Sequence, residues 1–166
     1  MARSIGSALT DALVLRFSQR ELRSRLGIAL PLVTVDVDGR PHPMLLSYLE
    51  VKAYDARTIG LVMLAKSRSA KNLVERGTAT LIAVEPDTTV YVKLRAVDGP
   101  LPVEGGADYG LGYFLMEVDE VLEDAAADWE AGMRITAPIR YEPAPTLDEP
   151  WARATLAALA DPRARA

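Results

Sequence analysis

The stretch GLVMLAKSRSAKN, residues 60–72, decides the fold. It opens with an apolar run that indicates a buried β-strand over residues 58–65. Ser67 then stands where its side chain can cap a helix, and Gly77 is typical of a helix end, so residues 67–76 are predicted to be helical. The inward side chains of that helix are expected to be Ala70, Leu73 and Val74.

The same stretch has a second interpretation as a nucleotide-binding P-loop. Gly60 and the pair Lys66 and Ser67 have the spacing of G-x-x-x-x-G-K-[ST], with Ala65 in place of the second glycine. A P-loop needs a glycine-rich turn whose backbone N–H groups surround phosphate, whereas residues 61–64 are apolar and favour burial in a sheet. We therefore favour the strand and helix.

The flanking sequence predicts further strands with short connections. Val33, Val35 and Val37 share one face of an expected strand over residues 30–38, and the turn pair Asp38 and Gly39 leads into a returning strand over residues 41–48. Residues 98–106, rich in glycine and proline, are expected to form a loop. The remaining expected strands are 78–84, 89–97, 112–121 and 134–141.

Helices are expected only around this sheet. Ser18 and Glu21 have the spacing of a capping box, which predicts a short helix within an N-terminal helical segment, residues 1–27. Trp151 and Leu159 indicate a C-terminal helix and tail, residues 148–166. The whole chain, residues 1–166, is thus predicted to be one domain, mostly β with flanking helices, in which six to seven mainly antiparallel strands form a barrel.

Composition excludes several classes of function. The chain has 19 Lys and Arg against 23 Asp and Glu, for a net charge of −4, and its basic residues form no stripe of the kind that binds nucleic acid. It has no cysteine and one histidine, His42, which cannot make a conventional zinc centre. We therefore expect no metal site. No apolar window is long enough to span a membrane, so we expect a soluble, cytoplasmic protein.

The order of motifs resembles the FMN-binding split-barrel superfamily, which includes the pyridoxamine 5'-phosphate oxidases. The matching pieces are V-T-V-D-x-D-G-x-P-H at 33–42, S-R-x-A-K-N-L at 67–73 and T-A-T-L-I-A-V at 78–84. Motifs support the resemblance over about residues 22–97, and strand order alone supports it beyond. The resemblance implies a split barrel, a flavin-dependent oxidoreductase of unknown substrate and a homodimer with FMN in a groove between subunits.

The resemblance also places the FMN phosphate at the helix after the third strand. The candidate cofactor-binding residues are Ser47, Lys52, Lys66, Ser67, Arg68, Ser69 and Lys71. Independently of the family, free N–H groups and the positive end of the helix dipole favour an anion, and an arginine can bind it through two hydrogen bonds. The alternative is that Ser67 only caps the helix and that the cations are solvated.

Because of two departures from the family pattern, the sequence does not decide which cofactor binds. Ser69 stands where the oxidases have a lysine, and Ser47 stands where they have a phosphate-binding arginine, although Lys52 matches one of their lysines. The deazaflavin F420, which relatives of this barrel use, is therefore an alternative to FMN. A non-catalytic flavin-binding or F420-binding dimer and a cofactor-free interaction protein also stay open, and no catalytic residue is assigned.

Overall fold

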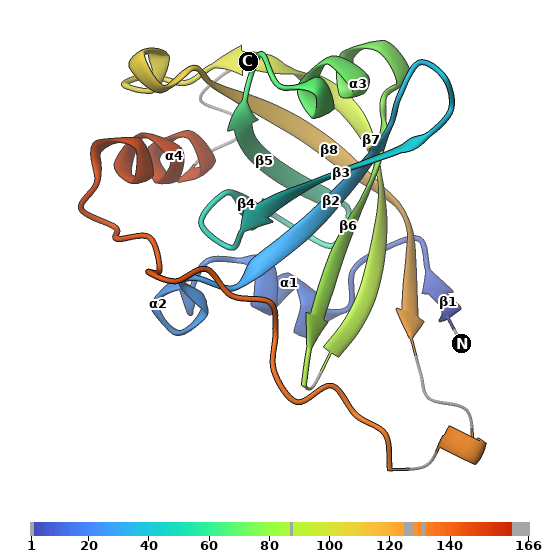
Figure 1. The fold of residues 1–166 in the computed structure, drawn as a ribbon. Helices are drawn as coiled ribbons and strands as arrows, with labels where there is room; N and C mark the ends of the chain where they lie inside the picture. The colour runs from blue at the N-terminus through green and yellow to red at the C-terminus, as the bar shows by residue number, and fades with distance from the viewer. Residues whose placement is uncertain (1, 87, 125–127, 131, 161–166) are drawn as a thin grey trace.

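One curled β-sheet forms the centre of the computed structural model (Figure 1). The structure describes residues 2–86, 88–124, 128–130 and 132–160. Within these residues, eight strands pair in the order β3-β2-β6-β7-β8-β5-β4, with β1 beside β8, and every pair is antiparallel. The strands are β1 (Ala2–Gly6), β2 (Ala29–Val35), β3 (Pro41–Ser47), β4 (Val51–Ala53), β5 (Thr58–Leu64), β6 (Thr78–Glu85), β7 (Thr88–Pro102) and β8 (Leu111–Asp124). The predicted split barrel is confirmed.

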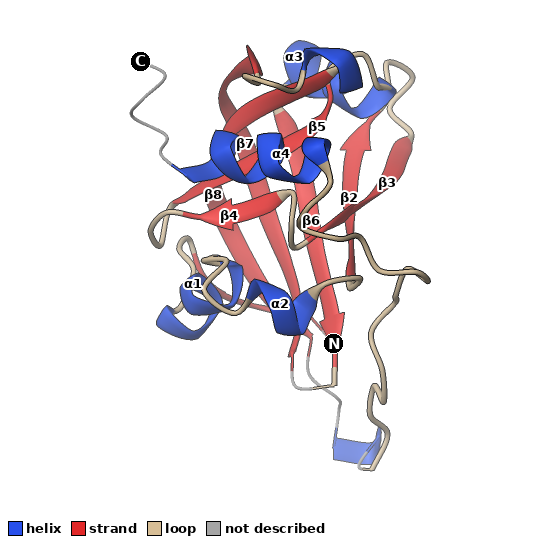
Figure 2. Cartoon of the chain, turned by 90° about the vertical axis from the view of Figure 1, so that its left-hand side faces the viewer, coloured by secondary structure: helices blue, strands red, loops and turns tan. Residues whose placement is uncertain are grey.

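The helices cover the ends and one side of this sheet (Figures 1 and 2). They are α1 (Asp11–Phe17), α2 (Leu22–Arg25), α3 (Arg68–Arg76) and α4 (Pro150–Ala160), with short 3₁₀ turns at Ala107–Tyr109 and Asp128–Glu130. Helix α3 lies at one end of the half-barrel, α1 and α2 lie at the other, and α4 lies across the side between them.

The β2–β3 hairpin forms as predicted, with Gly39 at a φ of 82° in the turn. Such a positive φ suits glycine, which has no side chain to clash. Strand β3 is an edge of the sheet, where Pro41 and Pro43 are tolerated because a missing N–H costs least there. The valine face of the hairpin turns outward, since Val35 is 36% exposed and Val37 is 87% exposed.

Helix α3 begins and ends where the sequence predicts. The Oγ of Ser67 accepts a hydrogen bond from the N–H of Ala70 (3.1 Å), and Gly77 closes the helix at a φ of 71°. One predicted inward side chain is wrong, because Val74 is 60% exposed while Asn72 is buried. Asn72 is turned inward because it hydrogen-bonds the buried Thr34 of β2.

The predicted capping box before the sheet is wrong. Helix α1 starts earlier, where the Oγ of Thr10 accepts a hydrogen bond from the N–H of Leu13 (3.3 Å). Ser18 ends that helix instead of starting the next, and its Oγ donates to the carbonyl of Leu15 (2.7 Å). Glu21 stands at the cap of the one-turn helix α2 without a side-chain capping bond. Because the Ser18 side chain is used at the end of α1, it does not cap the start of α2.

The late strands differ from prediction in two places. Strand β7 continues to Pro102, so the expected loop over 98–106 begins as sheet. A Cβ at Gly99 would lie 2.7 Å from the carbonyl oxygen of Tyr113, so glycine lets β7 approach β8 there. The strand expected over 134–141 is wrong, because these residues contribute only a single bridge between Arg140 and Ile28.

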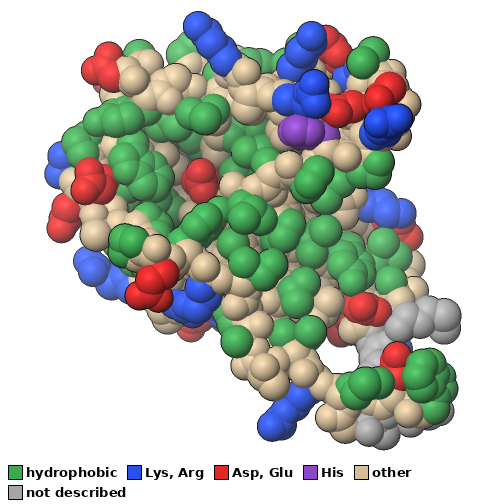
Figure 3. Space-filling view, in the orientation of Figure 1, with side chains coloured by type: hydrophobic (Ala, Val, Ile, Leu, Met, Phe, Trp, Pro, Cys, Tyr) green, Lys and Arg blue, Asp and Glu red, His purple; other side chains and the backbone are tan. Residues whose placement is uncertain are grey.

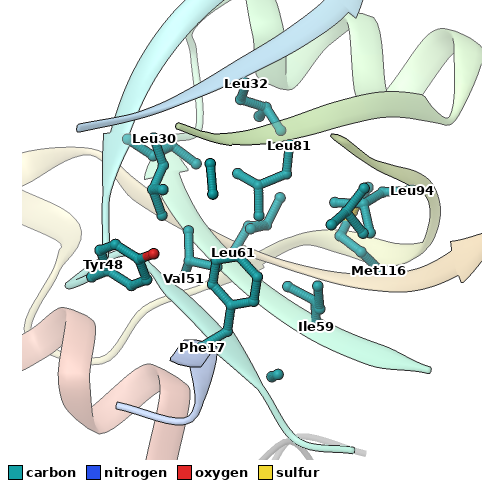
Figure 4. Close-up of a cluster of buried hydrophobic side chains, with 14 of the residues drawn as sticks. Phe17, Leu30, Leu32, Tyr48, Val51, Ile59, Leu61, Leu81, Leu94 and Met116 are labelled. Atoms are coloured by element: carbon teal, nitrogen blue, oxygen red, sulfur yellow. The ribbon is translucent and has the colours of Figure 1, made fainter. Parts of the chain in front are cut away.

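The core lies inside the curl of the sheet (Figure 4). Alternate strand residues fill it together with side chains from α1 and from the turn after β3. Those labelled in Figure 4 are Phe17, Leu30, Leu32, Tyr48, Val51, Ile59, Leu61, Leu81, Leu94 and Met116. The rings of Phe17 and Tyr48 stack at a centroid distance of 5.6 Å. A second apolar cluster lies beneath α4, where Ala158 and Leu159 pack near Val62 of β5. Helix α4 therefore covers the outer face of β5.

Candidate functional site

The first turn of α3 carries five of the seven residues predicted to bind the cofactor. Lys66 and Ser67 precede the helix, Arg68 and Ser69 begin it, and Lys71 follows one turn later. The backbone N–H groups of Arg68 and Ser69 have no acceptor among the described residues. Two hydrogen-bond donors are therefore available at the positive end of the helix dipole.

Ser69 adds an unsatisfied polar atom to this turn. Its side chain is 1% exposed, and its Oγ has no hydrogen-bond partner within the part of the chain that the structure describes. A buried polar atom without a partner is costly, which makes it a point where a ligand atom or a water can bind. The turn thus fits an oxygen-rich group such as phosphate.

Two of the three cations beside the turn already contact carboxylates. The Nη1 of Arg68 lies 3.4 Å from the Oδ2 of Asp36, and the Nζ of Lys71 lies 3.7 Å from the Oε1 of Glu75. For Lys66, no ion pair forms with any described residue. The first turn of α3 is therefore less strongly positive than its sequence suggests.

Asp36 is held in place beside this turn. The Nδ2 of Asn72 donates to the Oδ1 of Asp36 (2.8 Å) and also to the Oγ1 of Thr34 (3.0 Å). The bond from Asn72, followed by the charge of Arg68, holds the pKa of the Asp36 carboxyl below its usual value. The Nδ1 of His42 lies 3.9 Å from the Oδ2 of Asp36. These contacts tie α3 to the β2–β3 hairpin.

Ser47, a sixth predicted residue, contacts a carboxylate instead of a basic group. It ends β3, and both its backbone N–H (2.7 Å) and its Oγ (2.9 Å) donate to the Oε2 of Glu50. Burial raises the pKa of the Glu50 carboxyl to about 6, although the bonds from Ser47 act in the opposite direction. His42, beside Asp36, marks the part of β3 near α3. Ser47 is five residues further along β3, about 17 Å away at the usual strand rise, and so lies away from α3.

Lys52, the seventh residue, is engaged by the C-terminal helix. Its Nζ donates to the carbonyl of Ala160, the last residue of α4 (3.2 Å), and lies 5.5 Å from the ring centroid of Tyr54. The hydroxyl of Tyr54 lies 3.2 Å from the hydroxyl of the buried Tyr113. A Cβ at Gly60 would lie 2.5 Å from the Tyr54 hydroxyl, so a glycine is required for this packing. Neither Lys52 nor Ser47 contacts the five predicted residues at the first turn of α3.

A buried ionic cluster at the opposite end of the half-barrel was not foreseen. Glu85, the last residue of β6, lies 2.8 Å from Arg16 and 3.2 Å from Arg25, and it accepts a hydrogen bond from Tyr48. Burial and the bond to Glu85 raise the pKa of Tyr48. Four residues distant in sequence form the cluster, so no local motif predicts it. Its contacts attach α1 and α2 to the sheet.

Two other kinds of feature, a metal-binding cluster and a membrane-spanning helix, are absent from the described ranges. Among those residues, no group of three or more His, Cys, Asp or Glu side chains is placed to hold a metal ion. No helix within them has the length and apolar character needed to cross a membrane.

Comparison with known proteins identifies the family and supports the fold. No family model matches the chain. The Bacillus subtilis (strain 168) protein YclD, described as uncharacterized, is 32% identical over 109 residues, which are 64% of this chain and 70% of YclD. A "putative pyridoxamine 5'-phosphate oxidase" from Lactobacillus delbrueckii superposes with a TM-score of 0.55 at 16% identity, covering 72% of this chain and 98% of that one. An FMN-binding protein from Syntrophomonas wolfei superposes with a TM-score of 0.53 at 13% identity, covering 70% and 90%. The chain belongs to the family of YclD and has the split-barrel fold of the FMN-binding superfamily.

Proposed function

We propose that this protein binds a flavin or deazaflavin through a phosphate at the first turn of α3 and acts as a flavin-dependent oxidoreductase. The observation that carries the proposal is the set of unused donors in that turn, namely the N–H groups of Arg68 and Ser69 and the buried Oγ of Ser69. The similar structures support it, since one is described as FMN-binding and another as an oxidase of pyridoxamine 5'-phosphate.

Each residue of the turn has a distinct task in this proposal. The two N–H groups and the helix dipole hold phosphate oxygens, and the exposed guanidinium of Arg68 binds a further pair. Charge-assisted hydrogen bonds contribute about 1.5–3 kcal/mol each, so a few of them retain a cofactor. A bound flavin supplies hydride or electron transfer, while the protein supplies binding, orientation and electrostatics.

Ser47 and Lys52 are proposed to contact a different part of the cofactor. Both lie away from α3, on β3 and β4, where Glu50 and the end of α4 are their present partners. Their roles in binding follow from the family resemblance alone.

The phosphate assignment is tested by comparing FMN with riboflavin, which lacks the phosphate. Arg68→Ala is expected to weaken FMN binding about tenfold, because about 1.5 kcal/mol of charge-assisted bonding is lost, and to leave riboflavin binding unchanged. Lys93→Ala, which removes an exposed lysine of β7, is the matched control. Equal losses for both ligands would contradict the phosphate assignment.

Absorption spectroscopy separates the alternatives. The purified protein is incubated with FMN or with F420, desalted and scanned. A retained spectrum that NAD(P)H or an added substrate bleaches supports an enzyme, and one that neither changes supports a binding module. A protein that retains neither cofactor is the cofactor-free interaction protein.

We also propose a homodimer that acts on a small-molecule substrate. The outer face of β2 and β3 exposes apolar side chains that a partner subunit can cover, among them Pro43, Leu45 and Val35. Figure 3 shows hydrophobic side chains gathered over the centre of this face. Sedimentation of a monomer at micromolar concentration would contradict the dimer, and Leu45→Glu is expected to dissociate it.

A further inference from the structure

We propose that α4 is a displaceable cover over the flavin site and must leave the outer face of β5 before the ring of the cofactor can reach Lys52. This inference rests on the proposed flavin binding and adds the regulation of that site. Lys52 pairs with Gly60 of β5, and β5 leads from there to the first turn of α3. A cofactor held at both places therefore lies along the face of β5 that α4 occupies (Figure 2).

The end of α4 takes the hydrogen bond from Lys52 that the cofactor would take. The Nζ of Lys52 donates to the carbonyl of Ala160 (3.2 Å), at the negative end of the α4 dipole. Flavin and deazaflavin rings carry carbonyl oxygens along one edge, which are acceptors of the same kind. The ring of Tyr54 lies 5.5 Å from the same Nζ and provides an aromatic surface beside it. The ring edge of a cofactor and the end of α4 therefore compete for one place.

Few contacts hold α4 on β5. In the apolar cluster beneath it, the helix contributes Ala154, Ala158 and Leu159, of which only the leucine is large. The Cδ2 of Leu159 would lie 2.9 Å from a Cβ at Gly60, so the missing side chain there makes room for it. Among the described residues, the bond from Lys52 is the only hydrogen bond that joins α4 to the sheet. The packing of α4 on β5 therefore depends largely on Leu159.

Two features favour the departure of α4. Thr155 is fully buried, and its Oγ1 has no hydrogen-bond partner in the part of the chain that the structure describes. Such an atom is costly, and water satisfies it once the helix moves out. The segment before α4, residues 141–149, forms no strand or helix, and only Pro145 and Leu147 in it are partly buried (Figure 1). A segment with so few buried contacts lets α4 move without disturbing the barrel.

An engineered disulfide can hold α4 in place, because the chain has no cysteine of its own. A Cβ at Gly105, in the loop after β7, would lie 3.8 Å from the Cβ of Ala154, which is the usual separation in a disulfide. The bridge is only about 7.5 Å along the helix from Leu159. Gly105→Cys combined with Ala154→Cys is expected to bind FMN and riboflavin about tenfold more weakly with the disulfide formed than with it reduced. Each single variant is a control for the substitutions, including the strain of a cysteine at a φ of 70°, and should bind equally under both conditions.

Loosening α4 should have the opposite effect. Leu159→Ala is expected to tighten the binding of both ligands about tenfold, because the cofactor no longer has to displace the packed leucine. A direct measurement uses Ala158→Cys, whose side chain is buried and reacts with a thiol reagent only after α4 has left β5. FMN should speed this labelling several-fold. Ala83→Cys, buried in β6, reports unfolding of the whole protein and should label no faster with FMN.

The outcomes separate this inference from the proposed function. Equal affinities of the double variant for FMN with the disulfide formed and reduced overturn the cover and leave flavin binding in place. Labelling of Ala158→Cys that FMN does not speed up also overturns it, because α4 would then stay on β5 when the cofactor binds. If FMN binds neither the unmodified protein nor Leu159→Ala, the flavin site itself fails, and the inference fails with it.

Discussion

Glu50 should make the stability of this protein depend on pH in an unusual direction. Glu50 lies partly buried in the turn between β3 and β4, and burial raises the pKa of its carboxyl from the usual 4.5 to about 6. The folded state therefore binds the proton more tightly than the unfolded state does. The stabilisation from this group is present below pH 4.5 and is lost as the pH rises through 6.

The size of the effect follows from the two pKa values. A rise from 4.5 to about 6 corresponds to about 2 kcal/mol of free energy of unfolding. Glu50→Gln cannot ionise, and its amide still accepts hydrogen bonds from Ser47. The variant should thus gain about 2 kcal/mol of stability relative to the unmodified protein between pH 4 and pH 7.5.

Urea unfolding at a series of pH values from 4 to 7.5 measures this difference. Comparing the two proteins at each pH cancels the titration of all other groups, and Glu104→Gln controls for the loss of an exposed carboxylate. A difference between Glu50→Gln and the unmodified protein that stays constant with pH would refute the reasoning. A difference of opposite sign would mean that the bonds from Ser47 outweigh burial.

Three further substitutions test the packing around the sheet. Glu85→Ala removes the buried carboxylate that Arg16 and Arg25 contact and should cost about 3–5 kcal/mol in urea unfolding, whereas Glu123→Ala at an exposed pair should cost less than about 1 kcal/mol. Gly77→Ala should lower the free energy of unfolding by about 1 kcal/mol, because alanine is strained at a φ of 71° even though space is open around it. Ser67→Ala should cost a similar amount through the lost cap, and unchanged melting temperatures would contradict either estimate.

The elements that sequence predicted well have local causes. The hairpin turn is specified by Gly39, and α3 is bounded by Ser67 and Gly77, all within a few residues of the structure they determine. The antiparallel barrel followed from the spacing of such signals, because short turns between strands leave no room for crossover helices.

The elements that sequence missed are determined by distant partners. Strand β1 exists through its pairing with β8, more than a hundred residues away, and the three-residue β4 exists through its pairing with β5. Strand β7 continues through a segment rich in glycine and proline because its backbone hydrogen-bonds to β8 there. The register of this pairing shifts at residues 93–101. Burial of Asn72 instead of Val74 likewise depends on Thr34, which no helical period can reveal.

The candidate site also combines features that local sequence determines with features that distant residues determine. The donors of the first turn of α3 are consequences of local helix geometry, and so the sequence placed them correctly next to one another. The charge of that turn is not local, since Asp36 reaches Arg68 from the start of the β2–β3 turn, 32 residues earlier in the sequence. Lys52 shows the same limit, because its present partner is the carbonyl of Ala160 at the far end of the chain. A basic residue in a motif therefore predicts a charge at a position, whereas the carboxylates that the fold brings to it decide the net charge there.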